Sequence, residues 1–385
     1  MWLRVLGEFV SRAHQASTCR PRPPGLWRDL PGAIGLLLAS GFLAPVQVYA
    51  DEPAIESLWS GSAHADDSSE SFRHWDKEGE IPTGCASCHS TTGFLDFLGE
   101  DGSAAGTVEH AARTGTVIEC ASCHNDALRQ LDKVVFPSGL SVTDTGTSTS
   151  CTLCHQGRMS TPGVNENLEA LPDDGVSADL SFMNIHYRAA AASLYGSEVR
   201  GGYEYAGKAY AARFTHPEPL NNCVGCHDPH ALSVRSQQCT ECHEGIAEDQ
   251  LASIRLGSPD HDGDGDTTAG VSVELANLHR LLYDAITLYA TGVSKSPVVY
   301  DSGSYPYFFQ DTDANGQVDE GEAVFPNRYQ SWTPRLLRAA YNYQFVAKDP
   351  GSWAHNPRYA AQLLIDSIED LQESIDLDTP AMIRQ

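Results

Sequence analysis

Basic side chains and long apolar runs are scarce in this 385-residue chain. Lysine and arginine number 25 against 51 aspartates and glutamates, which gives a formal charge of −26. Such an acidic chain disfavours binding to nucleic acid or anionic membranes, and it favours basic partners or bound cations. After residue 50, no run approaches the roughly 20 apolar residues that a transmembrane helix needs. We therefore expect no integral membrane segment in the mature chain.

Residues 1–50 have the pattern of a signal peptide. Five arginines precede an apolar run at residues 32–43, and Val48-Tyr49-Ala50 resembles a signal-peptidase site. Removal of this segment would leave 20 basic and 49 acidic residues, a formal charge of −29. The sequence thus predicts an exported protein, either periplasmic or extracellular.

Unpaired cysteines are missing after residue 50, because all ten cysteines there form Cys-x-x-Cys pairs. Paired cysteines are also found in disulfide frameworks and zinc knuckles. Neither alternative explains why a histidine follows every pair. In Cys-x-x-Cys-His, two thioethers attach haem c and the histidine ligates its iron, so we predict five covalent haems. The motifs are Cys85/Cys88/His89, Cys120/Cys123/His124, Cys151/Cys154/His155, Cys223/Cys226/His227 and Cys239/Cys242/His243.

The second axial position of each iron decides between electron carrier and enzyme. A second histidine closes the iron, whereas an open position permits catalysis. His230 is too near His227 to reach the other face of the same haem, so it should ligate a neighbouring one. The five candidates are His64, His74, His186, His216 and His230. We interpret His110 as exposed, His261 as a member of an acidic loop, His279 as a core or surface histidine, and His355 as structural.

Apolar periodicity divides the chain near residue 250. Residues 51–250 have little of it, which fits a domain of loops and short helices whose core is haem. Within it, residues 184–196 predict a helix that would place His186 on a rigid element. Only sixteen residues separate Cys223 from Cys239, so the last two haems should lie close together. Residues 251–385 predict a helical domain, with apolar stripes over 275–289 and helix starts at Thr333-Pro334 and Asn356-Pro357.

Two acidic loops lie in the second region. The first candidate matches positions 1, 3, 5, 6, 7, 9 and 12 of an EF-hand calcium loop. Its residues are Asp311, Asp313, Asn315, Gly316, Gln317, Asp319 and Glu322. The other loop contains Asp260, Asp262, Asp264 and Asp266 but has Val271 at position 12. It is either a weaker ion site that borrows Glu274 or a solvated acidic turn.

The motifs carry a family resemblance. The repeated Cys-x-x-Cys-His, the Cys-His-Asp-Pro-His run at 226–230 and the sixteen-residue doubling resemble multihaem c-type cytochromes of the doubled-motif type. More narrowly, residues 62–65, 184–187 and 332–337 resemble exported bacterial pentahaem proteins with a helical C-terminal extension. The resemblance implies a mainly α fold with extensive loops, a multihaem cytochrome c domain at 51–250 and a small helical domain at 251–385. It also implies low-spin haems that relay electrons between redox partner proteins.

Three functions remain open at this stage. The leading hypothesis is an electron carrier with closely spaced, mostly bis-histidine haems, whose potentials the acidic surface lowers. The alternative is a multihaem oxidoreductase that acts on a small nitrogen or sulfur compound at one open haem. A third is a haem filament built from repeated copies, for which the helical extension would be awkward.

Overall fold

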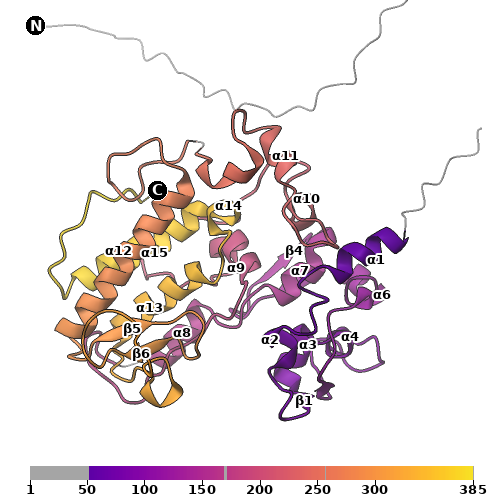
Figure 1. Ribbon diagram of the computed structural model, residues 1–385, viewed down its shortest axis with the longest axis horizontal. Helices are drawn as coiled ribbons and strands as arrows, with labels where there is room; N and C mark the ends of the chain where they lie inside the picture. Colours follow the sequence, from indigo (N-terminus) through magenta and orange to yellow (C-terminus); the bar gives the residue numbers. More distant parts are fainter. Residues whose placement is uncertain (1–51, 169–170, 256, 385) are drawn as a thin grey trace, which may run out of the picture. The chain divides into compact units, whose positions relative to one another are not determined.

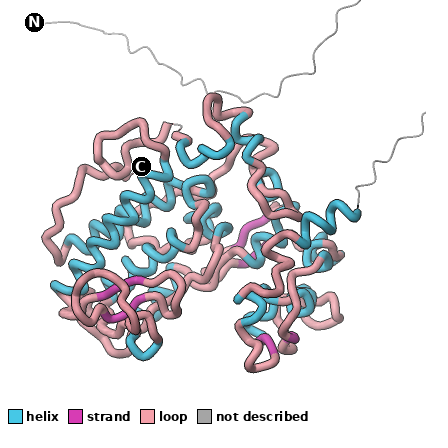
Figure 2. The backbone as a smooth tube through the Cα atoms, in the orientation of Figure 1, coloured by secondary structure: helices cyan, strands magenta, loops and turns pink. Residues whose placement is uncertain are grey.

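The computed structural model describes residues 52–168, 171–255 and 257–384. These residues form many short helices joined by loops, together with three two-stranded antiparallel sheets (Figures 1 and 2). The expected signal peptide lies outside the described residues. Among the helices that are described, none is long and apolar enough to cross a membrane.

The part of the chain that carries the five motifs is made of short elements. Its strands form two antiparallel ladders, β1 with β2 and β3 with β4, and only the second is a hairpin. The elements are α1 (Glu52–Ser60), α2 (Glu70–Arg73), β1 (Glu80–Ile81), α3 (Thr83–His89), α4 (Thr91–Leu98), β2 (Ala112–Arg113), α5 (Cys120–Cys123), α6 (Asp126–Gln130), β3 (Lys133–Val135), β4 (Ser141–Thr143), η1 (Gly146–Ser148), α7 (Thr149–Cys154), α8 (Thr161–Leu168), α9 (Ala190–Tyr195), η2 (Gly196–Glu198), α10 (Cys223–Cys226), α11 (Ser236–Thr240) and η3 (Glu248–Ser253).

Longer helices follow residue 270, and two of them begin where the sequence predicts. Thr333 Oγ1 accepts a hydrogen bond from Leu336 N, and Asn356 Oδ1 accepts one from Tyr359 N, so both residues are N-caps followed by proline. The elements are α12 (Val271–Gly292), β5 (Val298–Tyr300), β6 (Phe308–Gln310), η4 (Phe325–Asn327), α13 (Pro334–Ala347), α14 (Ser352–His355) and α15 (Pro357–Gln372).

One helix starts later than expected. α9 begins at Ala190, whereas the sequence predicts a helix from residue 184. His186 and Arg188 have positive φ angles of 83° and 54°, which a right-handed helix does not contain. The prediction that His186 lies on a helix is therefore wrong.

The hydrophobic core is concentrated on α12, α13 and α15, which pack against one another (Figure 1). The same core includes side chains from residues 164–203, before the expected boundary at 250. The expected domain division at residue 250 stays a prediction. The apolar core contains residues from both sides of that position.

The last two motifs lie in a stretch without a core. From residue 204 to residue 260, leaving out residue 256, no described residue is buried. A segment of this length ordinarily buries some apolar side chains to offset the entropy of ordering its backbone. Large apolar groups such as haem are the kind of material that would supply this missing burial.

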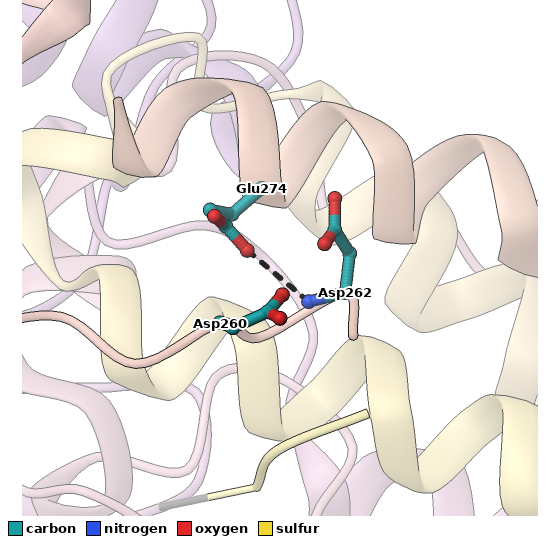
Figure 3. Close-up of side chains that lie close together, drawn as sticks. All are labelled: Asp260, Asp262 and Glu274. Atoms are coloured by element: carbon teal, nitrogen blue, oxygen red, sulfur yellow. Dashed lines mark hydrogen bonds between the residues drawn. The ribbon is translucent and has the colours of Figure 1, made fainter. Parts of the chain in front are cut away.

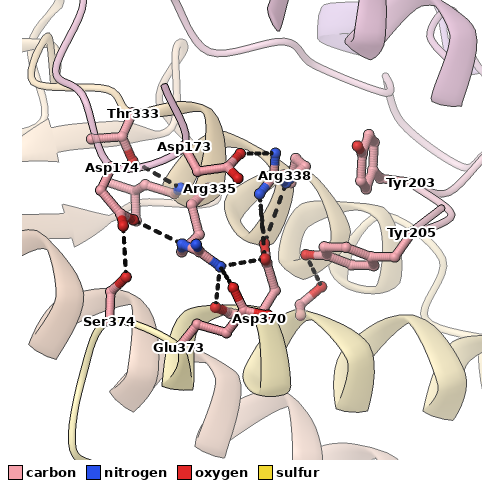
Figure 4. A network of polar contacts seen from close by, with 12 residues as sticks. Asp173, Asp174, Tyr203, Tyr205, Thr333, Arg335, Arg338, Asp370, Glu373 and Ser374 are labelled. Carbon is pink, nitrogen blue, oxygen red and sulfur yellow. Dashed lines mark hydrogen bonds and ion pairs between the residues drawn. The ribbon is translucent and has the colours of Figure 1, made fainter. Parts of the chain in front are cut away.

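A buried ionic network fastens the earlier chain to the C-terminal helices (Figure 4). Arg335, which is 5% exposed, donates to Asp174 Oδ1 at 2.7 Å and to Asp370 Oδ1 at 2.5 Å. Arg338 completes the network, because it donates to Asp370 and to Asp173. Asp173 and Asp174 lie in the stretch between the third and fourth motifs, so the network ties α13 and α15 to residues far away in the sequence.

We expect Arg335→Met to lower the free energy of unfolding by about 2 kcal/mol, because it removes the buried guanidinium that Asp174 and the half-buried Asp370 share. Chemical denaturation followed by far-ultraviolet circular dichroism measures this loss. The control is Arg280→Met, which removes an exposed pair with Asp284 and should change stability by no more than about 0.5 kcal/mol. Equal losses in the two variants would show that the network contributes no more than a surface pair.

Candidate haem and cation sites

Four of the motifs show the same backbone bond. The amide of the motif histidine donates to the carbonyl of the first cysteine in each, at 2.8 to 2.9 Å: His124 to Cys120, His155 to Cys151, His227 to Cys223 and His243 to Cys239. The first motif lies within helix α3. One helical turn places the two cysteines on the same face, as attachment to a single haem requires.

Nine of the ten motif cysteines are free thiols, the state from which a thioether to haem forms. Cys242 is predicted to be the second attachment point of the fifth motif, and this stays a prediction.

Backbone carbonyls orient three of the motif histidines. The Nδ1 atom of His89 lies 2.8 Å from Ser71 O, and that of His155 lies 2.8 Å from Arg188 O. His227 hydrogen-bonds the backbone of Leu232. A metal-bound histidine usually donates its other ring N–H to such an acceptor, which leaves Nε2 for the metal. These three rings are therefore held as iron ligands need to be.

Motif histidines are paired with other histidines at a recurrent spacing. Metal–imidazole bonds of about 2 Å place the centroids of two rings on opposite faces of one iron about 6 Å apart. Burial lowers the pKa of His216, and the charge of the nearby His243 lowers it further. The ring centroids are separated by 5.8 Å in His89–His186, 6.3 Å in His124–His230, 6.4 Å in His155–His64 and 6.4 Å in His227–His355. The chain therefore presents pairs of imidazoles at the separation that a bis-histidine iron requires.

Burial keeps several of these rings neutral. Desolvation, followed by the charge of His155, lowers the pKa of His64 to about 4. Desolvation and then His89 lower the pKa of His186 to about 4. Only the neutral imidazole has a free lone pair for iron, so these environments suit ligation.

The segment 184–188 serves two motifs at once. Asn184 Oδ1 accepts a hydrogen bond from His186 N at 2.9 Å and supports its left-handed backbone. The His186 ring lies beside His89, while the carbonyl of Arg188 accepts the bond from His155. Non-glycine residues in this conformation are uncommon and concentrate at functional sites.

His74 lies in a different environment from the other candidates. Its Nδ1 atom is 2.9 Å from Glu70 Oε1, and its side chain is 62% exposed. Its ring centroid lies 4.9 Å from that of Trp75, and the indole lies between His74 and His89 in a chain of ring contacts. The spacing of Glu70 and His74, four residues apart, is a sequence signal for such a surface helix pair.

His355 is the residue that sequence reasoning missed. It lies at the end of α14, next to His227 in space, and Asp349 holds its Nδ1 atom. The surrounding sequence contains no motif, and the pairing joins positions far apart in the chain. The two other histidines of the C-terminal region meet backbone carbonyls instead: His261 bonds Ile383 O, and His279 bonds Tyr343 O.

Thiols of different motifs also touch one another. Cys88 hydrogen-bonds Cys154, which lowers the pKa of Cys88 to about 7. Cys151 hydrogen-bonds Cys223, which lowers the pKa of Cys223 to about 6. The attachment points of the first, third and fourth motifs are therefore in contact, and Cys123 of the second motif bonds Ser150 beside the third.

The acidic loops bring some of their predicted ligands together. In the loop that begins at Asp260, oxygens of Asp260 and Asp262 and of Glu274 in α12 lie within 4.8 Å of one another (Figure 3). Burial, and then repulsion from Glu274 and Asp264, raise the pKa of Asp262. Arg255 forms an ion pair with Glu274. Asp264 and Asp266 are exposed and bond within the loop rather than joining the cluster.

The loop from Asp311 to Glu322 follows the EF-hand pattern more fully. Oxygens of Asp311, Asp313 and Glu322 lie within 4.8 Å of one another, and Asp311 and Glu322 are each only 4% exposed. Gly316 N donates to Asp311 Oδ2 at 2.9 Å, a bond from position 6 to position 1. Asn315 Nδ2 donates to Asp313 and Asp319. Gln317 occupies position 7, which supplies a backbone carbonyl in EF-hands.

Comparison with known proteins agrees with this site. The family described as "Cytochrome c7 and related cytochrome c" matches residues 70–156, which contain the first three motifs. Together with the relatives below, this match supports a multihaem c-type cytochrome.

Two similar proteins come from Geobacter sulfurreducens. "C-type polyheme cytochrome OmcB" is 27% identical over 82% of this chain and 47% of its own length. "C-type polyheme cytochrome OmcC" is 29% identical over 76% of this chain and 43% of its own length. The chain thus spans about half the length of these curated relatives. No solved structure matches it.

Proposed function

We propose that the chain is an exported pentahaem electron carrier that relays electrons between redox partner proteins. Each Cys-x-x-Cys-His motif would hold one haem c, which takes up and releases single electrons when bound. The observation that carries this proposal is the pairing of the motif histidines with further histidines at the bis-histidine spacing.

The proposed second ligands differ in one member from the set that the sequence suggests. His355 replaces His74, because His355 lies beside His227 whereas His74 is exposed and bonded to Glu70. The proposed pairs are His89–His186, His124–His230, His155–His64, His227–His355 and His243–His216.

Contacts between thiols support a relay order that differs from the sequence order. Cys88 and Cys154 connect the first and third sites, and Cys151 and Cys223 connect the third and fourth. The second site adjoins the third through Cys123 and Ser150. We therefore place the third site at the junction of the relay, with the fifth site reached through the fourth.

The pairing favours a carrier over an oxidoreductase. An enzyme acting on a small nitrogen or sulfur compound needs one iron with an open position. Every motif histidine here has a histidine neighbour, so the proposed set leaves no iron open. The excess of acidic residues favours basic surfaces on the redox partners.

The relay proposal is tested by a pyridine haemochrome count and low-temperature EPR of the purified protein. We expect five haems per chain and only low-spin signals, because both faces of each iron are closed. His186→Ala should convert one low-spin signal to high-spin, whereas His74→Ala should leave all signals unchanged. A stoichiometric high-spin signal in the unaltered protein would instead support the oxidoreductase. A count below five would mean that not every motif holds a haem.

We also propose that the loop from Asp311 to Glu322 binds calcium. Two buried carboxylates with a third beside them repel one another unless a cation lies between them. The loop offers oxygen ligands at the EF-hand positions, with Asn315, Gln317 and Asp319 completing the set. The cluster of Asp260, Asp262 and Glu274 would be a weaker site, since Arg255 already neutralises one of its carboxylates.

Calcium should raise the melting temperature of the protein relative to a sample in chelator, because a ligand that binds the folded state stabilises it, by about 2.7 kcal/mol at 100 times its Kd. Glu322→Gln should weaken calcium binding at least about tenfold, since it removes the negative charge of the ligand at position 12 of the loop. The matched control is Glu320→Gln, an exposed neighbour outside the cluster. Isothermal titration calorimetry measures the affinity of each variant for calcium, and then for magnesium. Equal calcium affinities in the two variants would exclude this site.

A further inference from the structure

The carboxylate of Asp349 is the most deeply buried acidic group next to a proposed iron ligand. Asp349 lies between α13 and α14 and is 2% exposed. Both of its oxygens lie 2.9 Å from Nδ1 of His355. Gly351 N donates to Asp349 Oδ1, which helps to fix the carboxylate. Burial raises the pKa of Asp349, but the hydrogen bond and charge of His355 and the bond from Gly351 act together with other contacts to keep it below its usual value.

This bond leaves one nitrogen of His355 for iron. Nδ1 carries the proton that Asp349 accepts, so Nε2 has the free lone pair. The ring centroid of His355 lies 6.4 Å from that of His227, the histidine of the fourth motif. Asp349 therefore holds His355 in the tautomer that ligation requires.

His355 differs in this respect from the other proposed ligands. Ser71, Arg188 and Leu232 offer neutral backbone carbonyls to the histidines of the first, third and fourth motifs. Among the described residues, His355 alone of the ten proposed ligands bonds a carboxylate. A carboxylate draws the Nδ1 proton more strongly than a carbonyl does, which makes the ring a stronger electron donor to the metal.

We propose that Asp349 is a positioning residue that gives His355 imidazolate character and makes the fourth site the lowest in reduction potential of the five. The inference rests on the proposed function, because it needs His355 as the second ligand at this site. Stronger donation stabilises the ferric over the ferrous state, and hydrogen bonding to a ligand is one of the means by which proteins set haem potentials. The proton stays between Nδ1 and Asp349 in both oxidation states, so the exchange involves one electron and no other reactant.

The test is a potentiometric titration of the haem-loaded Asp349→Asn protein, followed by visible absorption and EPR. Asparagine can still accept the Nδ1 hydrogen bond but carries no charge. We expect the equilibrium constant for one of the five reduction steps to increase at least tenfold, which raises its reduction potential by 59 mV for one electron. The other four steps should not move. If no step moves, or if the lowest step falls, the proposal is wrong.

The matched control is Glu70→Gln, which removes the charge from another close carboxylate–histidine pair of the described residues. His74 is not among the proposed ligands, so no step should shift by this amount. Equal shifts in the two variants would attribute the effect to net charge alone.

A second variant separates this inference from the pairing itself. His355→Ala should convert one low-spin EPR signal to high-spin, and that signal should be the last to be reduced in the unaltered protein. If no low-spin signal is lost, His355 is not a ligand and the proposed pairing fails at this site. If the lost signal is reduced earlier than the others, the pairing stands and the role of Asp349 is overturned, whether or not the Asp349→Asn protein assembles.

Discussion

The separation of paired imidazole rings is the constraint on which the rest of the haem-binding region depends. Two rings about 6 Å apart make at most weak contacts that do not fix their orientation, so other groups must hold each of them in place. Here backbone carbonyls, a buried carboxylate and strained turns do so. The region accordingly uses its hydrogen bonds to orient side chains, while apolar packing is concentrated in the helices after residue 270.

The sequence was most informative where chemistry is local. The five motifs, the two helix caps and the EF-hand spacing depend on residues within a few positions of one another, so all could be read directly as patterns. The neighbour of His227 has no such pattern, because His355 reaches it only through the packing of α13 to α15 with the earlier chain. The environment of His74 is local, since its spacing from Glu70 indicates a surface pair.

The boundary near residue 250 illustrates the same limit. Apolar periodicity begins there, and the sequence therefore suggests two separate bodies. In the structure, Asp173 and Asp174 meet Arg335 and Arg338, and the backbone of Arg188 meets that of Lys348. Ionic and backbone contacts of this kind have no periodic signature, so a pattern of apolar residues cannot reveal them. They connect haem-binding segments to helices that carry no motif.

The position of His355 has a consequence for the timing of assembly. A polypeptide is made and exported from its N-terminus, so each proposed pair becomes complete only when its later member has emerged. On this basis the third site closes first, at His155, and the first site closes at His186. The fourth site closes last of all, long after its cysteines have appeared, because its second ligand lies beyond every motif. A chain that ended before His355 would therefore leave the fourth site of the proposed relay without its second ligand.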